Sequence, residues 1–358
     1  MEGEPRSTDA LPQYNGAGEV YLVTGGEGFL GRHLVEALIR HRPAAEIRIF
    51  ARKQSYFDDP PNVHYVFGDL VDRQSVHAAC EGITTVFHVA SLLTPNEDML
   101  RRVNIDGTRY LLDAAREQQV RRMIFVGSST AVLNRVPLEN ADETAPYTTN
   151  PPDPYMAIKA EAERLVMAWG KETGRLVCTL RPPLMFGHGD RHLAPVLMPL
   201  AKSVFSRWRL GDGSVTNVMY VENAAHALLL AEERLQPGSP VDGEVFNVHD
   251  GYVINLYELA RVMAREIGLP HAEQLLRWRC PTLPVLAVAH MFDGIRVLMR
   301  PLVDWTPPLR VRDVLLVDLS HTFSAEKARK LLAYTPPISQ SEGLARTRSW
   351  LRKLYDEA

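Results

Sequence analysis

Cysteine is scarce in this chain of 358 residues, long apolar runs are absent, and neither sign of charge dominates. Three cysteines, Cys80, Cys178 and Cys280, stand far apart without CxxC spacing. They form neither a disulfide framework nor a zinc site, which suits a reducing, intracellular compartment. No stretch reaches the roughly 18–20 apolar residues that a membrane-spanning helix requires. Residues 1–18 are polar and lack the apolar core of a secretory signal, so we expect a flexible leader there.

An excess of basic residues is also missing. The chain has 40 Lys and Arg against 43 Asp and Glu, a formal net charge of −3. Because binding to a phosphate backbone requires a basic excess, nucleic acid is excluded as the main partner. The composition, 46% hydrophobic and 23% charged, is that of a globular protein with ample material for a core.

Short apolar strands alternate with helical patterns through the first half of the chain. The predicted strands are 19–24, 46–50, 63–67, 85–90, 123–127 and 176–180, and the clearest helices are 32–40, 104–117 and 157–169. This alternation indicates an α/β fold with a doubly wound parallel sheet. It predicts a nucleotide-binding domain over 19–182 and a smaller, mainly substrate-binding lobe over 183–358. Within that lobe, we expect segments near 216–226 and 243–249 to return to the first domain.

Three glycines, Gly25, Gly28 and Gly31, stand three residues apart between the first strand and the first helix. Glycine lets the backbone turn tightly and approach a pyrophosphate, and the helix N-terminus supplies free N–H groups. In this strand–turn–helix context the spacing predicts a dinucleotide loop, and a tight turn without a ligand is the weaker interpretation. Phe29 and Leu30 complete the predicted loop contacts.

The end of the second strand reads Ala51-Arg52-Lys53 and carries no acid. An acid there usually binds the ribose 2′-OH of NAD, whereas an Arg suits the 2′-phosphate of NADP. Arg52 therefore favours NADP, and two solvated basic residues with NAD bound by other contacts are the alternative. After the third strand, Asp69 is a candidate for the adenine amino group, with Leu70 beside it.

Tyr155 and Lys159 form a Tyr-x-x-x-Lys motif, whose i,i+4 spacing puts both side chains on one helix face. A tyrosine with a pKa near 10 is too weakly acidic to act as a base at neutral pH. A nearby ammonium group, together with an oxidised nicotinamide, lowers that pKa and favours the phenolate that removes a hydroxyl proton. Ser129, preferred to its neighbour Ser128, is predicted to bind the substrate oxygen.

Other polar residues near these strands have ordinary explanations. Asn104 is more simply a helix N-cap than a brace of the site. His88, in an apolar strand, is more simply a core residue than a ligand, and no His/Asp/Glu cluster has metal-ligand spacing. The apolar stretch 281–292 reads as a buried or substrate-lining helix, with an interfacial segment resting on a bilayer as the alternative.

Together these motifs identify a resemblance. TGGEGFLG, GDL, TVFHVAS, RVNIDGT, the paired serines, YMAIK and LRPPLMFG resemble an extended short-chain dehydrogenase/reductase. More narrowly, the chain from about residue 20 to about residue 352 resembles the 3β-hydroxysteroid dehydrogenase group and its sterol-4α-carboxylate 3-dehydrogenases. One departure is Ala51, where many relatives carry Asp and use NAD.

The resemblance implies a Rossmann domain and a C-terminal substrate lobe. It implies Tyr155 as the base, Lys159 as its activator and Ser129 as the hydroxyl partner. The cofactor contacts it implies include Pro182, near the nicotinamide, and Ala90, at the end of the fourth strand. It also raises the expectation of peripheral contact between residues 278–299 and the endoplasmic reticulum membrane, and of a homodimer through helices near Tyr155.

The expected function is NAD- or NADP-dependent oxidation of a sterol or triterpenoid 3β-hydroxyl to the 3-ketone, with loss of a C4 carboxylate as CO₂. An NADPH-dependent ketone or aldehyde reductase is the first alternative, which Arg52 favours. A regulator that senses nucleotides without catalysis is the second. Such proteins tend to lose the Tyr/Lys pair, which this chain retains.

Overall fold

A computed structural model describes residues 14–57, 60–202, 206–299, 303 and 309–357. Its larger sheet has seven strands in the order β11-β7-β5-β4-β1-β2-β3, and every neighbouring pair is parallel. The strands are β1 (Val20–Thr24), β2 (Glu46–Ala51), β3 (Val63–Phe67), β4 (Thr85–His88), β5 (Arg122–Val126), β7 (Leu176–Arg181) and β11 (Glu244–Asn247). The strand order reverses between β1 and β4, and in open α/β sheets ligands bind at the carboxyl ends beside such a reversal.

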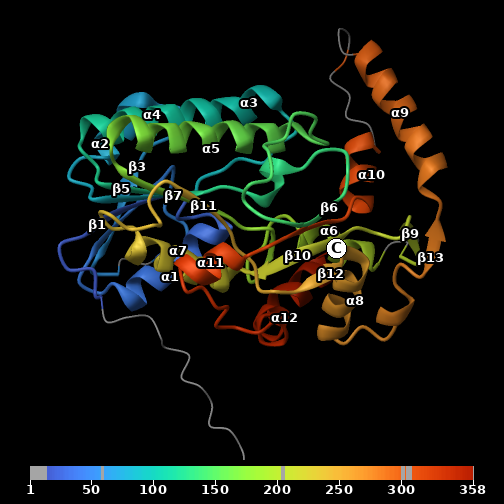
Figure 1. Ribbon diagram of the computed structural model, residues 1–358. Helices are drawn as coiled ribbons and strands as arrows, with labels where there is room; N and C mark the ends of the chain where they lie inside the picture. Colours follow the sequence, from blue (N-terminus) through green and yellow to red (C-terminus); the bar gives the residue numbers. More distant parts are fainter. Residues whose placement is uncertain (1–13, 58–59, 203–205, 300–302, 304–308, 358) are drawn as a thin grey trace, which may run out of the picture.

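Helices cover both faces of this sheet, as Figure 1 shows. One face carries α1 (Phe29–His41) and α7 (Val221–Arg234), whose buried Leu34, Leu38 and Leu228 share a core with β1 and β2. The other face carries α2 (Arg73–Ala79), α4 (Gly107–Glu117) and α5 (Pro154–Thr173), with α3 (Glu97–Arg101) and a π-helical turn, Arg102–Asp106, leading into α4. The predicted α/β sandwich is therefore confirmed.

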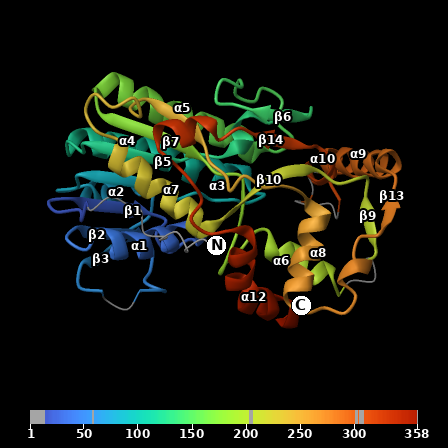
Figure 2. The same ribbon diagram turned by 60° about the horizontal axis from the view of Figure 1, so that its bottom comes forward.

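The smaller lobe is built around a second, mixed sheet in the order β12-β10-β14-β6, with β8 paired to β10 (Figure 2). Its strands are β6 (Leu138–Ala141), β8 (Leu184–Phe186), β10 (Val215–Tyr220), β12 (Val253–Asn255) and β14 (His321–Phe323). Its helices are α6 (Ala194–Leu200), α8 (Leu256–Glu266), α10 (Val311–Asp318) and α12 (Gln340–Glu357), whereas α11 (Glu326–Leu331) packs against β11 of the larger sheet. A separate pair, β9 (Trp208–Leu210) and β13 (Trp278–Cys280), carries α9 (Thr282–Met299).

The chain returns from the smaller lobe to the nucleotide-binding domain, but the returning segments differ in part from those that the sequence predicted. β11 joins the seven-stranded sheet beside β7. Residues 216–220, expected there too, instead lie in the second sheet, because β10 pairs with β8, β12 and β14. Residues 221–226 begin α7, which packs against α1. Residues 1–13 of the expected leader lie outside the described residues, whereas Tyr14 accepts a hydrogen bond from Arg42 through its carbonyl oxygen.

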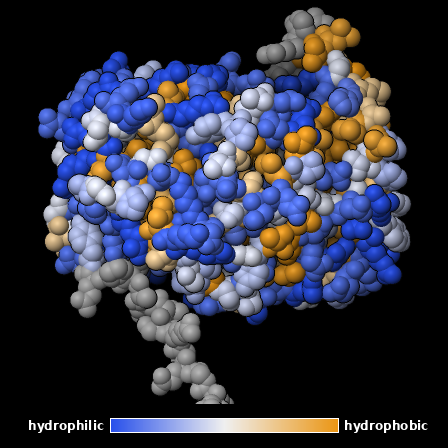
Figure 3. All heavy atoms as spheres, in the orientation of Figure 1, coloured by the Kyte–Doolittle hydropathy of each residue, from blue (hydrophilic) through white to orange (hydrophobic). Residues whose placement is uncertain are grey.

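Helix α9 corrects two expectations. It has 18 residues with a mean hydropathy of 1.4, so by length and composition alone one described helix is long and apolar enough to cross a membrane. It is also exposed, since only Ala289 is buried, and the prediction of a buried helix is wrong. Leu283, Val297 and Leu298 are 79%, 72% and 80% exposed. Figure 3 shows hydrophobic residues gathered over α9, at the upper right.

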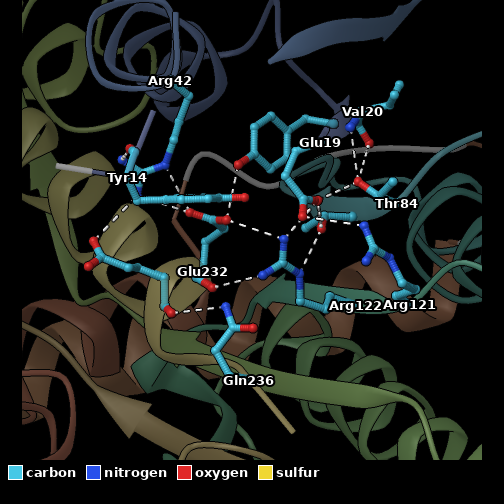
Figure 4. A network of polar contacts seen from close by, with 12 residues as sticks. Tyr14, Glu19, Val20, Arg42, Thr84, Arg121, Arg122, Glu232 and Gln236 are labelled. Atoms are coloured by element: carbon cyan, nitrogen blue, oxygen red, sulfur yellow. Dashed lines mark hydrogen bonds and ion pairs between the residues drawn. The ribbon is translucent and has the colours of Figure 1, made fainter. Parts of the chain in front are cut away.

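A buried network of charges lies at the amino ends of the central strands (Figure 4). Arg42, the C-cap of α1, pairs with Glu232 from α7 at 3.0 Å, and both side chains are fully buried. Arg122, at the start of β5, pairs with Glu19, before β1, at 2.8 Å. A buried charge left without its partner is costly, so the network fixes how α1 and α7 dock on the sheet.

Candidate functional site

The glycine loop has no room for side chains at two of its positions. Gly25 has a φ of +71°, and a Cβ there would lie 2.7 Å from the Cα of Ala90, beyond the end of β4. A Cβ on Gly31 would lie 2.0 Å from the carbonyl oxygen of Gly25. The turn is closed by the Gly28 N–H, which donates to that same oxygen at 2.8 Å. Bare backbone therefore faces the N-terminus of α1, an arrangement that fits a pyrophosphate.

Tyr155 and Lys159 lie on the first turns of α5. Asp153 caps this helix by accepting from the Tyr155 N–H at 2.8 Å, and Pro154 occupies its first position. The Tyr155 hydroxyl lies 3.5 Å from Ser91 Oγ, beyond the end of β4. Lys159 Nζ donates to the carbonyl oxygen of Val126, the last residue of β5, at 2.7 Å. The motif is thus anchored at the carboxyl edge of the sheet, where the glycine loop also lies.

Burial perturbs both members of this pair. It raises the pKa of Tyr155, and the hydrogen bond with Ser91 opposes that rise. It lowers the pKa of Lys159 to about 8, against the attraction of Glu163. Lys159 Nζ also lies 4.6 Å from the centre of the Phe125 ring, which favours the ammonium form. A tyrosine so buried requires added positive charge before it ionises near neutral pH, and oxidised nicotinamide carries such a charge.

The two serines after β5 have different surroundings. Ser128 Oγ accepts from the Thr130 N–H at 3.2 Å and lies 2.8 Å from Thr130 Oγ1, so it caps the short 3₁₀ turn Ser129–Val132. Ser129 is buried, and its N–H donates to the carbonyl oxygen of Pro182 at 3.2 Å. Ser128 is therefore occupied locally, whereas Ser129 lies beside the predicted nicotinamide contact. This arrangement favours Ser129 as the substrate's partner.

Asn104 is not a helix cap, so the simpler of the two predictions for it is wrong. It lies in the π-helical turn, where its Oδ1 accepts from the Leu92 N–H at 2.8 Å and from Ser91 Oγ at 3.1 Å. Its Nδ2 donates to the carbonyl oxygens of Leu92 and Leu100, each at 2.9 Å. Asn104 thus braces the loop that presents Ser91 to Tyr155.

Ser91 was missed in the sequence. Its only signal is its position three residues beyond β4, at the sheet edge where ligands bind. His88, by contrast, is the core residue that its apolar strand predicted. Its Nδ1 lies 2.8 Å from Thr24 Oγ1, its Nε2 lies 3.0 Å from Thr108 Oγ1, and burial lowers its pKa to about 3.

The residues predicted for the adenosine half surround the ends of β2 and β3. Arg52 and Lys53 are exposed directly after β2. Asp69 follows β3, and its Oδ1 accepts from the Val71 N–H at 3.2 Å, which leaves acceptor capacity on its carboxylate. Leu70 is buried, and a Cβ added at Gly107 would lie 3.0 Å from the Cβ of Leu70.

A buried ion pair supports the site from behind. Glu163, two turns after Tyr155 on α5, pairs with Arg181 at the end of β7, with 2.6 Å between Oε1 and Nη2. Both are buried, and the Tyr147 hydroxyl donates to Glu163 at 2.8 Å.

Among the described residues, no group of three or more His, Cys, Asp or Glu is placed to hold a metal ion.

Comparison with known proteins agrees with this geometry. Residues 22–278 match the model of the 3-beta hydroxysteroid dehydrogenase/isomerase family. A 3-beta-hydroxysteroid dehydrogenase of Mycolicibacterium neoaurum is 31% identical over 94% of this chain and 92% of its own length. The decarboxylating sterol-4-alpha-carboxylate 3-dehydrogenase of Mus musculus is 30% identical over 91% of this chain and 89% of its own length.

Solved structures share the fold at lower identity. The crystal structure of gox2253 has a TM-score of 0.75 and 23% identity, over 94% of this chain and 98% of that one. A UDP-glucuronic acid 4-epimerase from Bacillus cereus, solved in complex with NAD, has a TM-score of 0.70 and 18% identity, over 94% of this chain and 99% of that one. The Rossmann sheet and the smaller mixed sheet are thus those of a known extended architecture.

Proposed function

Since the chain belongs to the 3-beta hydroxysteroid dehydrogenase/isomerase family, we propose that it oxidises the 3β-hydroxyl of a sterol-like substrate that carries a C4 carboxylate. It is an NAD(P)-dependent oxidoreductase of the extended short-chain type. The observation that carries the proposal is the Tyr155–Lys159 pair, anchored on Val126 beside the glycine loop. The decarboxylating branch rests on relatives about 30% identical to this chain.

Each residue of the site then has a chemical task. The phenolate of Tyr155 accepts the proton of the 3β-hydroxyl, and Lys159, on the same helix face, stabilises that phenolate. Ser129 donates to the substrate oxygen and so holds C3 in line with the nicotinamide. Ser91 contacts the Tyr155 hydroxyl and lowers its pKa, as Asn104 keeps Ser91 in place. The glycine loop would hold the dinucleotide, whose oxidised nicotinamide would supply the acceptor for the hydride of C3.

Loss of CO₂ requires little further from the protein. Oxidation at C3 turns a 4-carboxylate into a β-keto acid. When the bond from C4 to the carboxylate breaks, its electron pair moves to C4 and onto the ketone oxygen as an enolate, which then takes up a proton. Ser129 and the protonated Tyr155 are hydrogen-bond donors at the oxygen where that charge develops.

Product analysis by mass spectrometry tests the proposal. The protein is incubated with a 3β-hydroxy-4α-carboxysterol and, separately, with a 3β-hydroxysteroid that lacks the carboxylate, each with NAD⁺ and with NADP⁺. A 3-ketosterol that has lost the carboxylate supports the proposal. Oxidation of the second substrate alone contradicts the decarboxylating branch. A third incubation contains a 3-ketosteroid and NADPH, and turnover there alone supports the reductase. Binding of dinucleotide without turnover of any substrate supports the regulator.

The choice between NAD and NADP belongs to the proposal as well. The exposed pair Arg52 and Lys53 supports NADP, as the sequence predicts. Two solved structures that share the fold, the UDP-glucuronic acid 4-epimerase and DesIV, contain NAD. A carboxylate in the glycine loop, that of Glu27, bears on the same choice.

We also propose that α9 contacts a membrane, as the resemblance predicts for residues 278–299. Beside α9, Trp208 and Trp278 are half-exposed and pack edge to face at 5.4 Å between ring centres. The guanidinium of Arg207 lies 5.7 Å from the Trp278 ring. Tryptophan favours the membrane–water interface, and cationic residues attract anionic headgroups. These features fit an intracellular protein that lies at the surface of the endoplasmic reticulum membrane.

Flotation with vesicles of phosphatidylcholine, with and without phosphatidylserine, measures this contact. Wild-type protein should float with the vesicles, and the double variant Leu283→Ser, Val297→Ser should stay in the dense fraction. Val253→Ser is the matched control, because Val253 is 55% exposed on β12, outside α9 and the β9/β13 pair.

The predicted homodimer, through helices near Tyr155, would use α4 and α5, and sedimentation equilibrium tests it.

A further inference from the structure

The carboxyl end of β2 lacks its usual acid but has a carboxylate close by. In Rossmann folds an acid near this point binds the ribose 2′-OH of NAD, and here Ala51 ends the strand. Glu27, in the glycine loop that joins β1 to α1, lies beside this end of β2. The loop packs directly on β2, since a Cβ on Gly26 would lie 2.8 Å from Ile49 Cγ2.

Two contacts fix the position of the Glu27 carboxylate. Its Oε1 accepts from the Ser55 N–H at 3.3 Å, four residues beyond the end of β2. The same oxygen accepts from the Tyr65 hydroxyl. Tyr65 is on β3 and stands opposite Ile49 of β2 in the strand register. The carboxylate is therefore held across the carboxyl ends of β2 and β3, where the sheet binds adenosine.

The remaining oxygen of this carboxylate gives the site its selectivity. Within the described part of the chain, the hydrogen bonds to Glu27 end on Oε1, so Oε2 is an acceptor for an incoming hydroxyl. A ribose 2′-OH can donate to it. A 2′-phosphate has no such proton at neutral pH and brings negative charge to a carboxylate.

We propose that Glu27 takes the place of the missing β2 acid and makes the enzyme prefer NAD to NADP. This inference rests on the proposed function, a dehydrogenase that uses a nicotinamide dinucleotide. It opposes the preference for NADP that was predicted from Arg52. The side chains of Arg52 and Lys53 are exposed, so water and salt screen their charges. Glu27 is half-buried in the loop, where its charge is screened less.

Binding of the reduced cofactors tests the inference without any steroid. NADH and NADPH are titrated into the protein, and the rise in nicotinamide fluorescence gives the two dissociation constants. Wild-type protein should bind NADH at least about tenfold more tightly. Glu27→Gln keeps the size and removes the charge, and should reduce the ratio about tenfold, mainly by tightening NADPH. The matched control is Glu139→Gln, an exposed glutamate on β6 of the second sheet, which should leave both dissociation constants unchanged.

Three results overturn the inference. Tighter binding of NADPH by the wild type contradicts it directly, even if Glu27→Gln does not fold. Equal weakening of both cofactors by Glu27→Gln gives Glu27 a purely structural role, as a tie between the loop and β3. A larger change of the ratio in Arg52→Ala than in Glu27→Gln assigns selectivity to Arg52. If neither dinucleotide binds, the proposed function fails as well, so the two failures are distinguishable.

Discussion

At the scale of single residues, the proposed proton acceptor, Tyr155, has surroundings that oppose its ionisation. Burial raises the pKa of Tyr155, and only Ser91 lowers it among the described groups that act on it. We expect Tyr155→Phe to lower kcat by about 10²–10⁴, the usual contribution of a positioned acid–base group. The measurement is oxidation of a 3β-hydroxysteroid at pH 7. The control is NADH binding, which should stay within twofold, and retention of most of the turnover would remove Tyr155 from the mechanism.

The second residue-scale prediction concerns pH. In the proposed mechanism Lys159 stabilises the Tyr155 phenolate once the cofactor is bound, so Lys159→Met should raise the pKa of Tyr155 in the working enzyme. Because the base acts only above its pKa, the rate of oxidation should fall by a hundredfold or more at pH 7 and by much less near pH 10. Rates measured across this range check the shift. A loss that is the same at every pH would mean that Lys159 only holds the cofactor.

At the scale of elements, α5 joins the site to the sheet through the Glu163–Arg181 pair. Removing one member leaves the other charged and buried. We expect Glu163→Gln to reduce the free energy of unfolding by about 3–5 kcal/mol, measured by urea denaturation. The double variant Glu163→Gln, Arg181→Met should recover part of this loss, because it leaves no lone charge. No recovery would contradict the explanation by a lone buried charge.

The elements also separate what the sequence could predict from what it could not. β3 was predicted with its exact bounds and the glycine loop with its turn, because both depend on local pattern and on glycine's backbone freedom. The contact from Asn104 through Ser91 to Tyr155 joins three segments over 64 residues, and no local pattern encodes it. Three-residue strands such as β12 and β14 are too short to show a period. The exposure of α9 depends on what packs against it, which hydropathy does not report.

At the scale of the whole molecule, neutral buried histidines make stability depend on pH. Burial lowers the pKa of five described histidines that are buried or half-buried, His88 to about 3 and His226 to about 4 among them. A histidine whose folded pKa is depressed contributes stability that is complete above about pH 6.5 and is lost as the pH falls toward the folded pKa. Asp250 acts in the opposite sense, because burial raises its pKa to about 6.

The expected result is a melting temperature that falls between pH 7.5 and pH 5. His226→Asn should make this fall shallower, because one fewer group takes up a proton on unfolding. Asp250→Asn should make it steeper, because Asp250 resists acid unfolding between about pH 6 and pH 4. Thermal denaturation of the three proteins at matched ionic strength provides the comparison. A flat profile in the wild type would contradict the assignment.

The distribution of the three thiols gives the wild-type chain a natural labelling position. Cys80 and Cys178 are buried, and burial raises the pKa of each, to about 12 for Cys80. Cys280 is partly accessible on β13, two residues before α9 begins. A maleimide fluorophore or a nitroxide should therefore attach there first, without any cysteine being added or removed. The unaltered protein can thus carry a spectroscopic reporter beside its most apolar exposed helix.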